Sequence, residues 1–279
     1  PAMLPEVEMS TIKKDLYRRD FSINAMAVKL NQEEFGILID FFGSRRDLSK
    51  GVIRALHPLS FIEDPTRILR AVRFEQRFGF EIEVRTAELL KQCAAEGYLD
   101  RVTGQRLRDE LIKTLYEPLP LKALRRLSGF GVTEKLFPQS KFDRETDIML
   151  DRYFCRRDRN ASIIGEDKIF YTLLMIMLRN SDNEAVEWCI ERYGLTRNFL
   201  DRLTDAIDTA GRIVNEKPKT PSQFHVLLRT RKPETLNFVD SHLDNDYDLL
   251  FFSYLKRLSE TRLTIDGNAL IEKYGMKEG

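Results

Sequence analysis

The segment 63–78 constrains this chain more than any other, because a helix start is followed by a one-sided row of arginines. Asp64 is a favourable N-cap residue, since its carboxylate can accept hydrogen bonds from the free N–H groups of the first turn. Pro65 suits the first helical position, where its missing N–H costs nothing. The sequence therefore predicts a helix that begins after Asp64 and has apolar residues beside a basic face.

Arginines at spacings of three and four residues form this basic face, which we call the arginine stripe. Its members are Arg67, Arg70, Arg73 and Arg77. At about 100° per residue they fall within roughly one third of the helix circumference. No acidic residue interrupts the stripe, so its like charges repel one another unless an anion lies against them. Arginine favours bidentate recognition of phosphate or base edges, but spacing alone leaves a solvated face equally open.

Asp64 and Arg67 are three residues apart, so both side chains can point at one spot. A carboxylate only accepts hydrogen bonds and a guanidinium only donates them. Cytosine and adenine place an amino donor beside a ring-nitrogen acceptor, whereas guanine and uracil place a carbonyl beside a ring N–H. The pair thus predicts selection of C and A without a nucleic-acid template. The alternative is that Asp64 only caps the helix and Arg67 pairs with it.

Composition limits the remaining classes of protein. The 279 residues are 42% hydrophobic and 32% charged, which is typical of soluble globular chains. No apolar run could cross a membrane and no signal peptide is found. The three cysteines show no pairing pattern, so we expect a reducing cytoplasm. The histidines stand apart from one another and from the cysteines, which argues against a zinc site. Because the net charge is only +1, RNA binding must depend on local basic patches.

Upstream of the helix the sequence predicts the end of a small sheet. The apolar run 37–42 lies between two glycines and predicts a buried strand, and 47–54 predicts a turn and a second strand of the same sheet. Arg18 and Arg19 precede Asp20, and they form either ion pairs with nearby acids or a phosphate clamp. Downstream, helices are expected over 86–97, from Gln105, over 121–128 and in most of 143–258, with a linker at 217–221.

Three ordered motifs carry a resemblance to a known family. They are RRDFSINAMA at 18–27, LIDFFGSRRDLSKGVIR at 38–54 and EDPTRILRAVRFEQRFGF at 63–80. Together they resemble the bacterial class II tRNA nucleotidyltransferase and poly(A) polymerase family, which includes CCA-adding, CC-adding and A-adding enzymes. The resemblance implies a mainly α chain, with the remnant of a β-polymerase-like α/β head followed by a helical neck, body and tail. The implied parts are head 1–56, neck 57–140 with the nucleotide-selecting helix, body 141–216 and tRNA-binding tail 217–279.

The resemblance also implies nucleotide-binding residues. Arg19, the second arginine of the first motif, would contact the incoming nucleotide. Asp64 and Arg67 match the pair with which the family recognises the base of CTP or ATP. Arg70 and Arg73 match further nucleotide-contacting arginines on the same helix.

A later motif, which contains Arg106 and Glu110, resembles a neck motif, and packing within the neck is the expected role of both residues. A loose match to a tail motif lies at 263–279.

The family holds two Mg²⁺ ions with a D-x-D pair on an early head strand, and the resemblance places this pair upstream of Pro1. We therefore expect a fragment with no catalytic or metal-binding residue of its own and no catalysis by this chain alone. The implied reaction of the complete protein adds C and/or A, from CTP and ATP, to the 3′ end of tRNA. Residues 141–279 would bind the tRNA through shape and phosphates. The alternatives are a bacterial poly(A) polymerase and a non-catalytic helical RNA-binding or scaffold protein.

Overall fold

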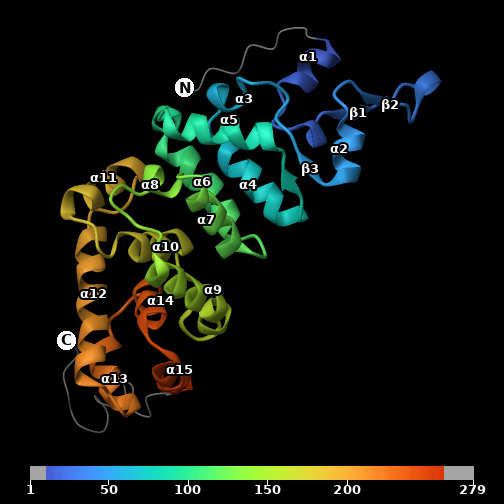
Figure 1. Ribbon diagram of the computed structural model, residues 1–279. Helices are drawn as coiled ribbons and strands as arrows, with labels where there is room; N and C mark the ends of the chain where they lie inside the picture. The colour runs from blue at the N-terminus through green and yellow to red at the C-terminus, as the bar shows by residue number, and fades with distance from the viewer. Residues whose placement is uncertain (1–10, 261–279) are drawn as a thin grey trace, which may run out of the picture. The chain divides into compact units, whose positions relative to one another are not determined.

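The computed structural model describes residues 11–260 as a predominantly helical chain (Figure 1). The described residues form two compact units. The first unit holds residues 11–151 and 169–201, and the second holds residues 152–168 and 202–260. The mainly α class is thus confirmed, whereas the division into head, neck, body and tail stays a prediction. The tail motif at 263–279 lies outside the described residues.

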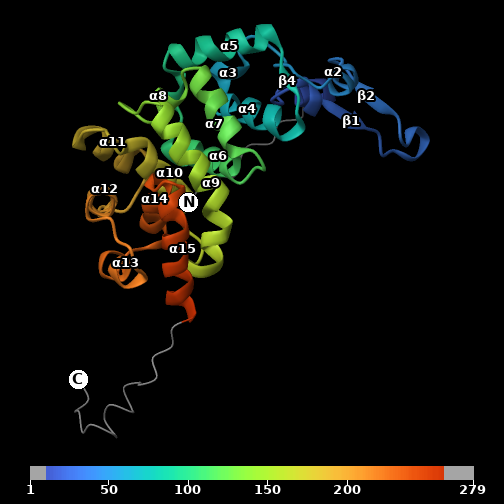
Figure 2. The same ribbon diagram turned by 60° about the horizontal axis from the view of Figure 1, so that its bottom comes forward.

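The first unit contains two small pairs of strands. β1 (Met26–Val28) pairs antiparallel with β2 (Leu38–Asp40), and β3 (Val52–Ile53) pairs parallel with β4 (Glu81–Ile82). The hairpin of β1 and β2 extends away from helices α4 to α7 in both views (Figures 1 and 2). The prediction that 37–42 and 47–54 contribute strands to one sheet is therefore wrong.

The burial predicted for 37–42 is also wrong, because Leu38 is 43% exposed and its neighbours Ile37 and Phe41 are similarly exposed. Within residues 11–260, β2 pairs with β1 alone, so a two-stranded hairpin cannot bury both of its faces. The turn predicted at the start of 47–54 is the end of a helix, α2 (Ser44–Lys50), which stops at Gly51 with a left-handed φ of 66°. The strand predicted after it is present as β3.

The other short elements of this region are α1 (Ile12–Tyr17), η1 (Ser22–Asn24) and η2 (Gln32–Glu34).

Helices follow from residue 60 onward and form the main core of the first unit. They are α3 (Ser60–Glu63), α4 (Arg67–Phe78), α5 (Val84–Ala95), η3 (Tyr98–Arg101), α6 (Gly104–Leu115), α7 (Pro120–Gly129) and α8 (Thr133–Leu136). α4 packs against α6 and α7 and buries its apolar side, including Ile68, Leu69 and Val72. This packing places the arginine stripe next to α6.

The later helices complete both units. They are α9 (Arg144–Ile164), α10 (Ile169–Leu178), α11 (Asn183–Tyr193), α12 (Phe199–Glu216), α13 (Pro221–Leu228), α14 (Pro233–His242) and α15 (Asn245–Glu260). All ten residues of α10 are buried, as its continuous apolar run suggests. The predicted linker falls between α12 and α13, where Thr220 and Gln223 form a capping box. None of the helices in the described part of the chain is long and apolar enough to cross a membrane.

One close helix contact fixes the beginning of α6. A Cβ atom at Gly104 would lie 1.5 Å from the backbone oxygen of Arg192, at the end of α11. Arg108, one turn further along α6, donates a hydrogen bond to the backbone oxygen of Tyr193 at 3.1 Å. Only glycine permits this approach, so the position of α6 relative to α11 depends on Gly104.

Candidate functional site

The predicted helix start is present, with a shift of two residues. α4 begins at Arg67, and Pro65 and Thr66 form the turn that leads into it. Asp64 has an extended backbone, with φ −141° and ψ 93°. Its Oδ1 accepts from the backbone N–H of Thr66 at 3.1 Å and from the Thr66 hydroxyl at 2.6 Å. Asp64 therefore supplies the helix-start acceptor that the sequence predicts.

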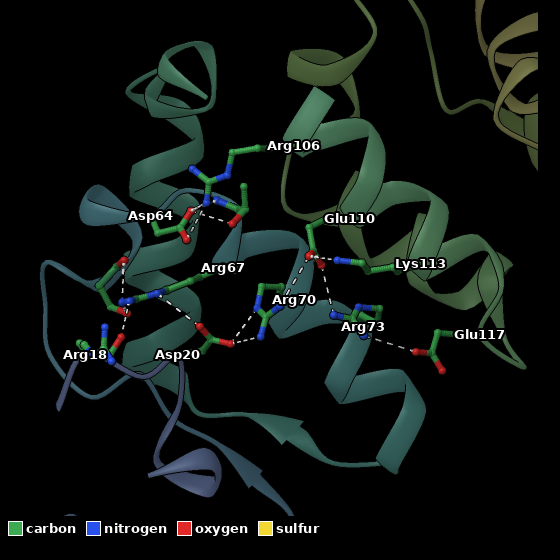
Figure 3. A network of polar contacts seen from close by, with 12 residues as sticks. Arg18, Asp20, Asp64, Arg67, Arg70, Arg73, Arg106, Glu110, Lys113 and Glu117 are labelled. Atoms are coloured by element: carbon green, nitrogen blue, oxygen red, sulfur yellow. Dashed lines mark hydrogen bonds and ion pairs between the residues drawn. The ribbon is translucent and has the colours of Figure 1, made fainter. Parts of the chain in front are cut away.

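Two arginines of the stripe are buried and bonded to the protein. Only 8% of the Arg67 side chain is exposed, and it donates to the Ser60 hydroxyl and to the backbone oxygen of Arg18, both at 2.7 Å. Arg73 is buried as well and donates to Glu110 at 3.1 Å. Carboxylates of the protein thus supply the anions that the stripe requires, which the sequence pattern did not reveal (Figure 3).

Arg70 connects the segment before β1 with α6. Its Nε donates to Asp20 at 2.7 Å, its Nη2 donates to the same carboxylate, and its Nη1 lies 3.5 Å from Glu110. Burial disfavours the charge of Arg70, but these two carboxylates outweigh it and raise the pKa of the guanidinium. Burial likewise acts to raise the pKa of Glu110, yet the hydrogen bond from Lys113 and the charges of Arg73 and Arg70 hold this pKa below its ordinary value. Arg70 and Glu110 are therefore both ionised at neutral pH.

Asp64 faces Arg106 of α6 (Figure 3). Nη2 of Arg106 lies 3.1 Å from Oδ1 and 3.0 Å from Oδ2 of Asp64. The Arg106 side chain remains 56% exposed, so it is available to solvent and to a ligand as well as to Asp64.

The sequence predicts packing within the neck for both Arg106 and Glu110, and Glu110 is indeed buried. Arg106 is the residue of the site that sequence reasoning missed. Its spacing of four from Glu110 was the available signal, because it places both side chains on one face of α6.

Two adjoining hollows open beside these side chains. The first, which we call the basic hollow, has a volume of about 570 Å³ and is lined by Arg18, Arg19, Asp20, Asn24 and Arg70. The second, which we call the mixed hollow, has a volume of about 390 Å³ and is lined by Asp20, Asp64, Thr66, Arg70, Arg106, Asp109, Glu110 and Lys113. Asp20 and Arg70 line both hollows, so the two are direct neighbours. The basic hollow suits a phosphate chain, and the mixed hollow offers both donors and acceptors to a polar ring.

The hollows bring together three of the five predicted nucleotide-binding residues. Arg19 lines the basic hollow, Asp64 lines the mixed hollow and Arg70 lines both. Arg67 and Arg73 are in the lining of neither, because they are turned into contacts with the protein.

The arginines of the first motif form an ion-pair cluster with one acid. Asp15 accepts from Arg18 Nε at 2.8 Å and from Arg19 at 3.3 Å, and these hydrogen bonds lower the pKa of the Asp15 carboxyl. All three side chains are exposed to solvent to a considerable degree. An exposed pair of this kind contributes little to stability, so the two guanidinium groups can turn toward an anionic ligand at small cost.

The described part of the chain contains no set of side chains that could serve as metal ligands. No three His, Cys, Asp or Glu side chains among residues 11–260 are grouped so that they could hold a metal ion. The residues present therefore do not fit a two-metal site.

Two protein-family models match the chain. The Poly A polymerase head domain matches residues 2–54, and the model described as "Probable RNA and SrmB- binding site of polymerase A" matches residues 79–143.

The chain is also similar to curated proteins and solved structures. Its sequence is 44% identical to that of the A-adding tRNA nucleotidyltransferase of Halalkalibacterium halodurans. The alignment covers 99% of this chain and 63% of that protein. The structure of the Thermotoga maritima CCA-adding enzyme complexed with tRNA superposes on this chain with a TM-score of 0.89 and 44% sequence identity. The match covers 96% of this chain and 66% of the Thermotoga chain. The structure of a tRNA-processing enzyme complex superposes with a TM-score of 0.79 and 30% sequence identity. This match covers 95% of this chain and 72% of the other chain.

The matches extend beyond the motifs. The chain spans less than two thirds of the curated A-adding relatives, for example 63% of the Halalkalibacterium protein and 34% of the Aquifex aeolicus protein. Within that span the likeness covers nearly every residue of this chain, including the helices that carry no motif. The chain therefore belongs to the tRNA nucleotidyltransferase and poly(A) polymerase family.

Proposed function

We propose that the protein adds C and/or A nucleotides to the 3′ end of tRNA without a nucleic-acid template, and that this chain supplies the nucleotide-selecting and RNA-binding part. The single observation that carries the proposal is the pair of adjoining hollows at the start of α4. One hollow is rich in arginine, and the other contains the carboxylate of Asp64. A nucleotide has the same two halves, an anionic phosphate chain and a polar base.

The phosphate chain is assigned to the basic hollow. Arg18, Arg19 and Arg70 face it against the single carboxylate of Asp20, so its lining carries a net positive charge. Guanidinium groups bind phosphate oxygens through paired, charge-assisted hydrogen bonds. Arg73 contributes indirectly in this arrangement, since its bond to Glu110 supports the carboxylate that lies beside Arg70.

The base is assigned to the mixed hollow. Asp64 would accept from the exocyclic amino group that cytosine and adenine share. Arg67 would donate to the adjacent ring nitrogen. To make this contact, Arg67 would give up its hydrogen bond to the backbone oxygen of Arg18. Structures of CCA-adding enzymes with ATP and with CTP, each 43–44% identical to this chain, support the assignment of both nucleotides as substrates.

RNA contact is assigned to the helices that follow α4. The family match described as a probable RNA-binding site covers residues 79–143, and the similar Thermotoga enzyme was solved with tRNA. We therefore extend the proposed tRNA-binding surface from residues 141–279 to include α5 to α8. Structured RNA is recognised mainly through shape and backbone, which suits a helical surface without a base-specific motif.

Mg²⁺ is the metal that this family membership implies for the complete protein. Residues 11–260 do not group the carboxylates that would hold it, so its ligands are proposed to lie outside them. For the same reason residues 11–260 alone are expected to bind nucleotide without transferring it. The site of action proposed for the complete protein is the cytoplasm.

The test is an incorporation assay with the full-length protein. It combines tRNA that lacks its terminal nucleotides, Mg²⁺ and labelled CTP, ATP, GTP or UTP. Incorporation of C, A or both, with G and U rejected, is the expected result. Failure to incorporate either C or A would refute the proposal.

A matched pair of variants connects the assay to the hollows. Arg70→Ala removes a guanidinium that lines both hollows and should raise the KM for nucleotide about tenfold or more, since one charge-assisted hydrogen bond is worth roughly 1.5–3 kcal/mol. Arg77→Ala removes an exposed arginine from the same helix that lines neither hollow, and it should leave the KM within about twofold. Equal effects of the two substitutions would contradict the placement of the nucleotide.

A further inference from the structure

The two oxygens of Asp64 have unequal surroundings. Each carboxylate oxygen can accept about two hydrogen bonds. Oδ1 faces three donors: the Thr66 backbone N–H at 3.1 Å, the Thr66 hydroxyl at 2.6 Å and Arg106 Nη2 at 3.1 Å. Oδ2 has one donor within hydrogen-bond distance in the described part of the chain, Arg106 Nη2 at 3.0 Å. Oδ1 is therefore saturated, and Oδ2 keeps the capacity to accept one more hydrogen bond.

The donors that saturate Oδ1 are held by the fold. The Thr66 N–H belongs to the turn before α4 and cannot rotate. Thr66 is only 3% exposed, so water does not compete for its hydroxyl. Arg106 extends from the first turns of α6, whose position is fixed by the close contact of Gly104 with Arg192. The carboxylate of Asp64 is thus held in one orientation from two separate elements.

We infer that Thr66 and Arg106 are positioning residues for base selection. By engaging Oδ1 they present Oδ2 as the single acceptor of Asp64 toward the mixed hollow, where the base amino group donates. This inference rests on the proposed function, because it specifies how the same site distinguishes C and A from U and G.

Rejection of U and G depends on this fixed orientation. A carbonyl oxygen of uracil or guanine would face Oδ2, and two acceptors repel each other. A carboxylate free to rotate would turn away and relieve the repulsion. It would also release Arg106, whose guanidinium could then donate to that carbonyl. Holding Asp64 in place therefore prevents a neighbouring donor in the same hollow from admitting the wrong base.

The experiment compares Thr66→Val with Thr66→Ser in the full-length protein. Valine has nearly the shape of threonine but no hydroxyl, whereas serine keeps the hydroxyl. The measured quantity is the ratio of kcat/KM for CTP to that for UTP, and for ATP to that for GTP if A is incorporated. We expect Thr66→Val to lower the ratio about tenfold, mainly through a lower KM for the wrong nucleotide, because a hydrogen bond to a charged group is lost. Thr66→Ser should keep the ratio within about twofold of the wild type.

Arg106 provides an independent second test. Its exposed side chain tolerates replacement, so Arg106→Met remains informative if Thr66→Val does not fold. We expect Arg106→Met to lower the ratio several-fold and Arg106→Lys, which keeps a donor, to lower it less. Arg85→Met is the matched control, since Arg85 is an exposed arginine of α5 that lines neither hollow.

Each outcome has a defined meaning. Folded Thr66→Val and Arg106→Met proteins that both keep the wild-type ratio would overturn the inference and leave the proposed function standing. A loss of kcat for right and wrong nucleotides alike, with the ratio unchanged, would also overturn it, because that pattern indicates a merely structural role. A wild-type protein that shows no preference among the four nucleotides would overturn the proposed function itself and the inference with it.

Discussion

Replacing Asp64 with asparagine should shift the base preference of the site from C toward U. An isolated asparagine amide can turn to present either its oxygen or its nitrogen. The structure removes this choice, because the backbone N–H of Thr66 can only donate and lies 3.1 Å from Oδ1. The amide oxygen of asparagine must therefore occupy the Oδ1 position. Its NH₂ group then occupies the Oδ2 position, from which the exposed Arg106 guanidinium must turn away, and it presents a donor to the base, where Asp64 presents an acceptor.

The expected size follows from one exchanged base contact. A good contact to a base edge discriminates by roughly 1–3 kcal/mol, and about 1.4 kcal/mol corresponds to a factor of ten. The CTP/UTP ratio of kcat/KM should therefore fall by a factor of about 5–150. The free energy of unfolding should change little. Asparagine caps helices about as well as aspartate, and an ion pair with an exposed partner such as Arg106 contributes about 0–1 kcal/mol.

The assay measures CTP and UTP incorporation by the full-length protein for the wild type, Asp64→Asn and Asp64→Ala, with thermal unfolding as the control for stability. Alanine removes the acceptor without supplying a donor, so its CTP/UTP ratio should fall less than that of Asp64→Asn. Equal ratios in Asp64→Asn and Asp64→Ala would show that the amide turns freely, which refutes the fixed orientation. An unchanged ratio in both variants would show that Asp64 is only a helix cap.

Three further predictions concern the support of the site and the second unit. Gly104→Ala should destabilise the protein by about 1–3 kcal/mol or more in urea denaturation, because its Cβ would lie 1.5 Å from the backbone oxygen of Arg192; an unfolding free energy equal to the wild type would contradict the close contact. Glu110→Gln should cost about 3 kcal/mol in the same measurement, because it leaves the buried guanidinium of Arg73 without its nearest carboxylate; a neutral effect would show that the remaining partners suffice. Burial raises the pKa of Asp240 from 3.8 to about 6, so its ionisation should lower stability as the pH rises from about 4 to 7. Asp240→Asn should then gain up to about 3 kcal/mol relative to the wild type across that range, and parallel pH profiles of the two proteins would contradict this.

Much of the fold could be predicted because its signals are local. The apolar run of α10, the Pro-marked linker before α13 and the start of α4 each depend on residues within a few positions of one another. The motif order added the sequence of helices and the mainly α class. Local patterns were misleading only where a segment depends on a distant partner. α2 is an example, since Asp47 accepts from Ser22 in a buried contact that a turn prediction cannot anticipate.

The sequence predicts the hydrogen-bond acceptor of the candidate site, Asp64, but it does not predict which side chains pair with the site residues. Asp64 is marked by the helix start that follows it, whereas its ion pair with Arg106 joins residues 42 positions apart. The same limit applies to Asp20, which lies 50 positions before Arg70. Periodicity indicates which face of a helix is basic, but it contains no information on which carboxylates of other elements neutralise that face. This is why the buried contacts of Arg67 and Arg73 became apparent only in the structure.

Asp20 and Arg70 line both hollows, which implies that the phosphate chain and the base of a nucleotide are not bound independently. Asp20 holds Arg70 through hydrogen bonds and lies 3.6 Å from Nε of Arg67. A triphosphate that accepts from Arg70 competes with Asp20 for the same N–H groups. Any shift of Asp20 then changes the electrostatic surroundings of Arg67, which the proposed base contact requires. Phosphate binding and base selection should therefore be coupled through Asp20, so that a nucleoside without phosphates is selected less strictly than its triphosphate.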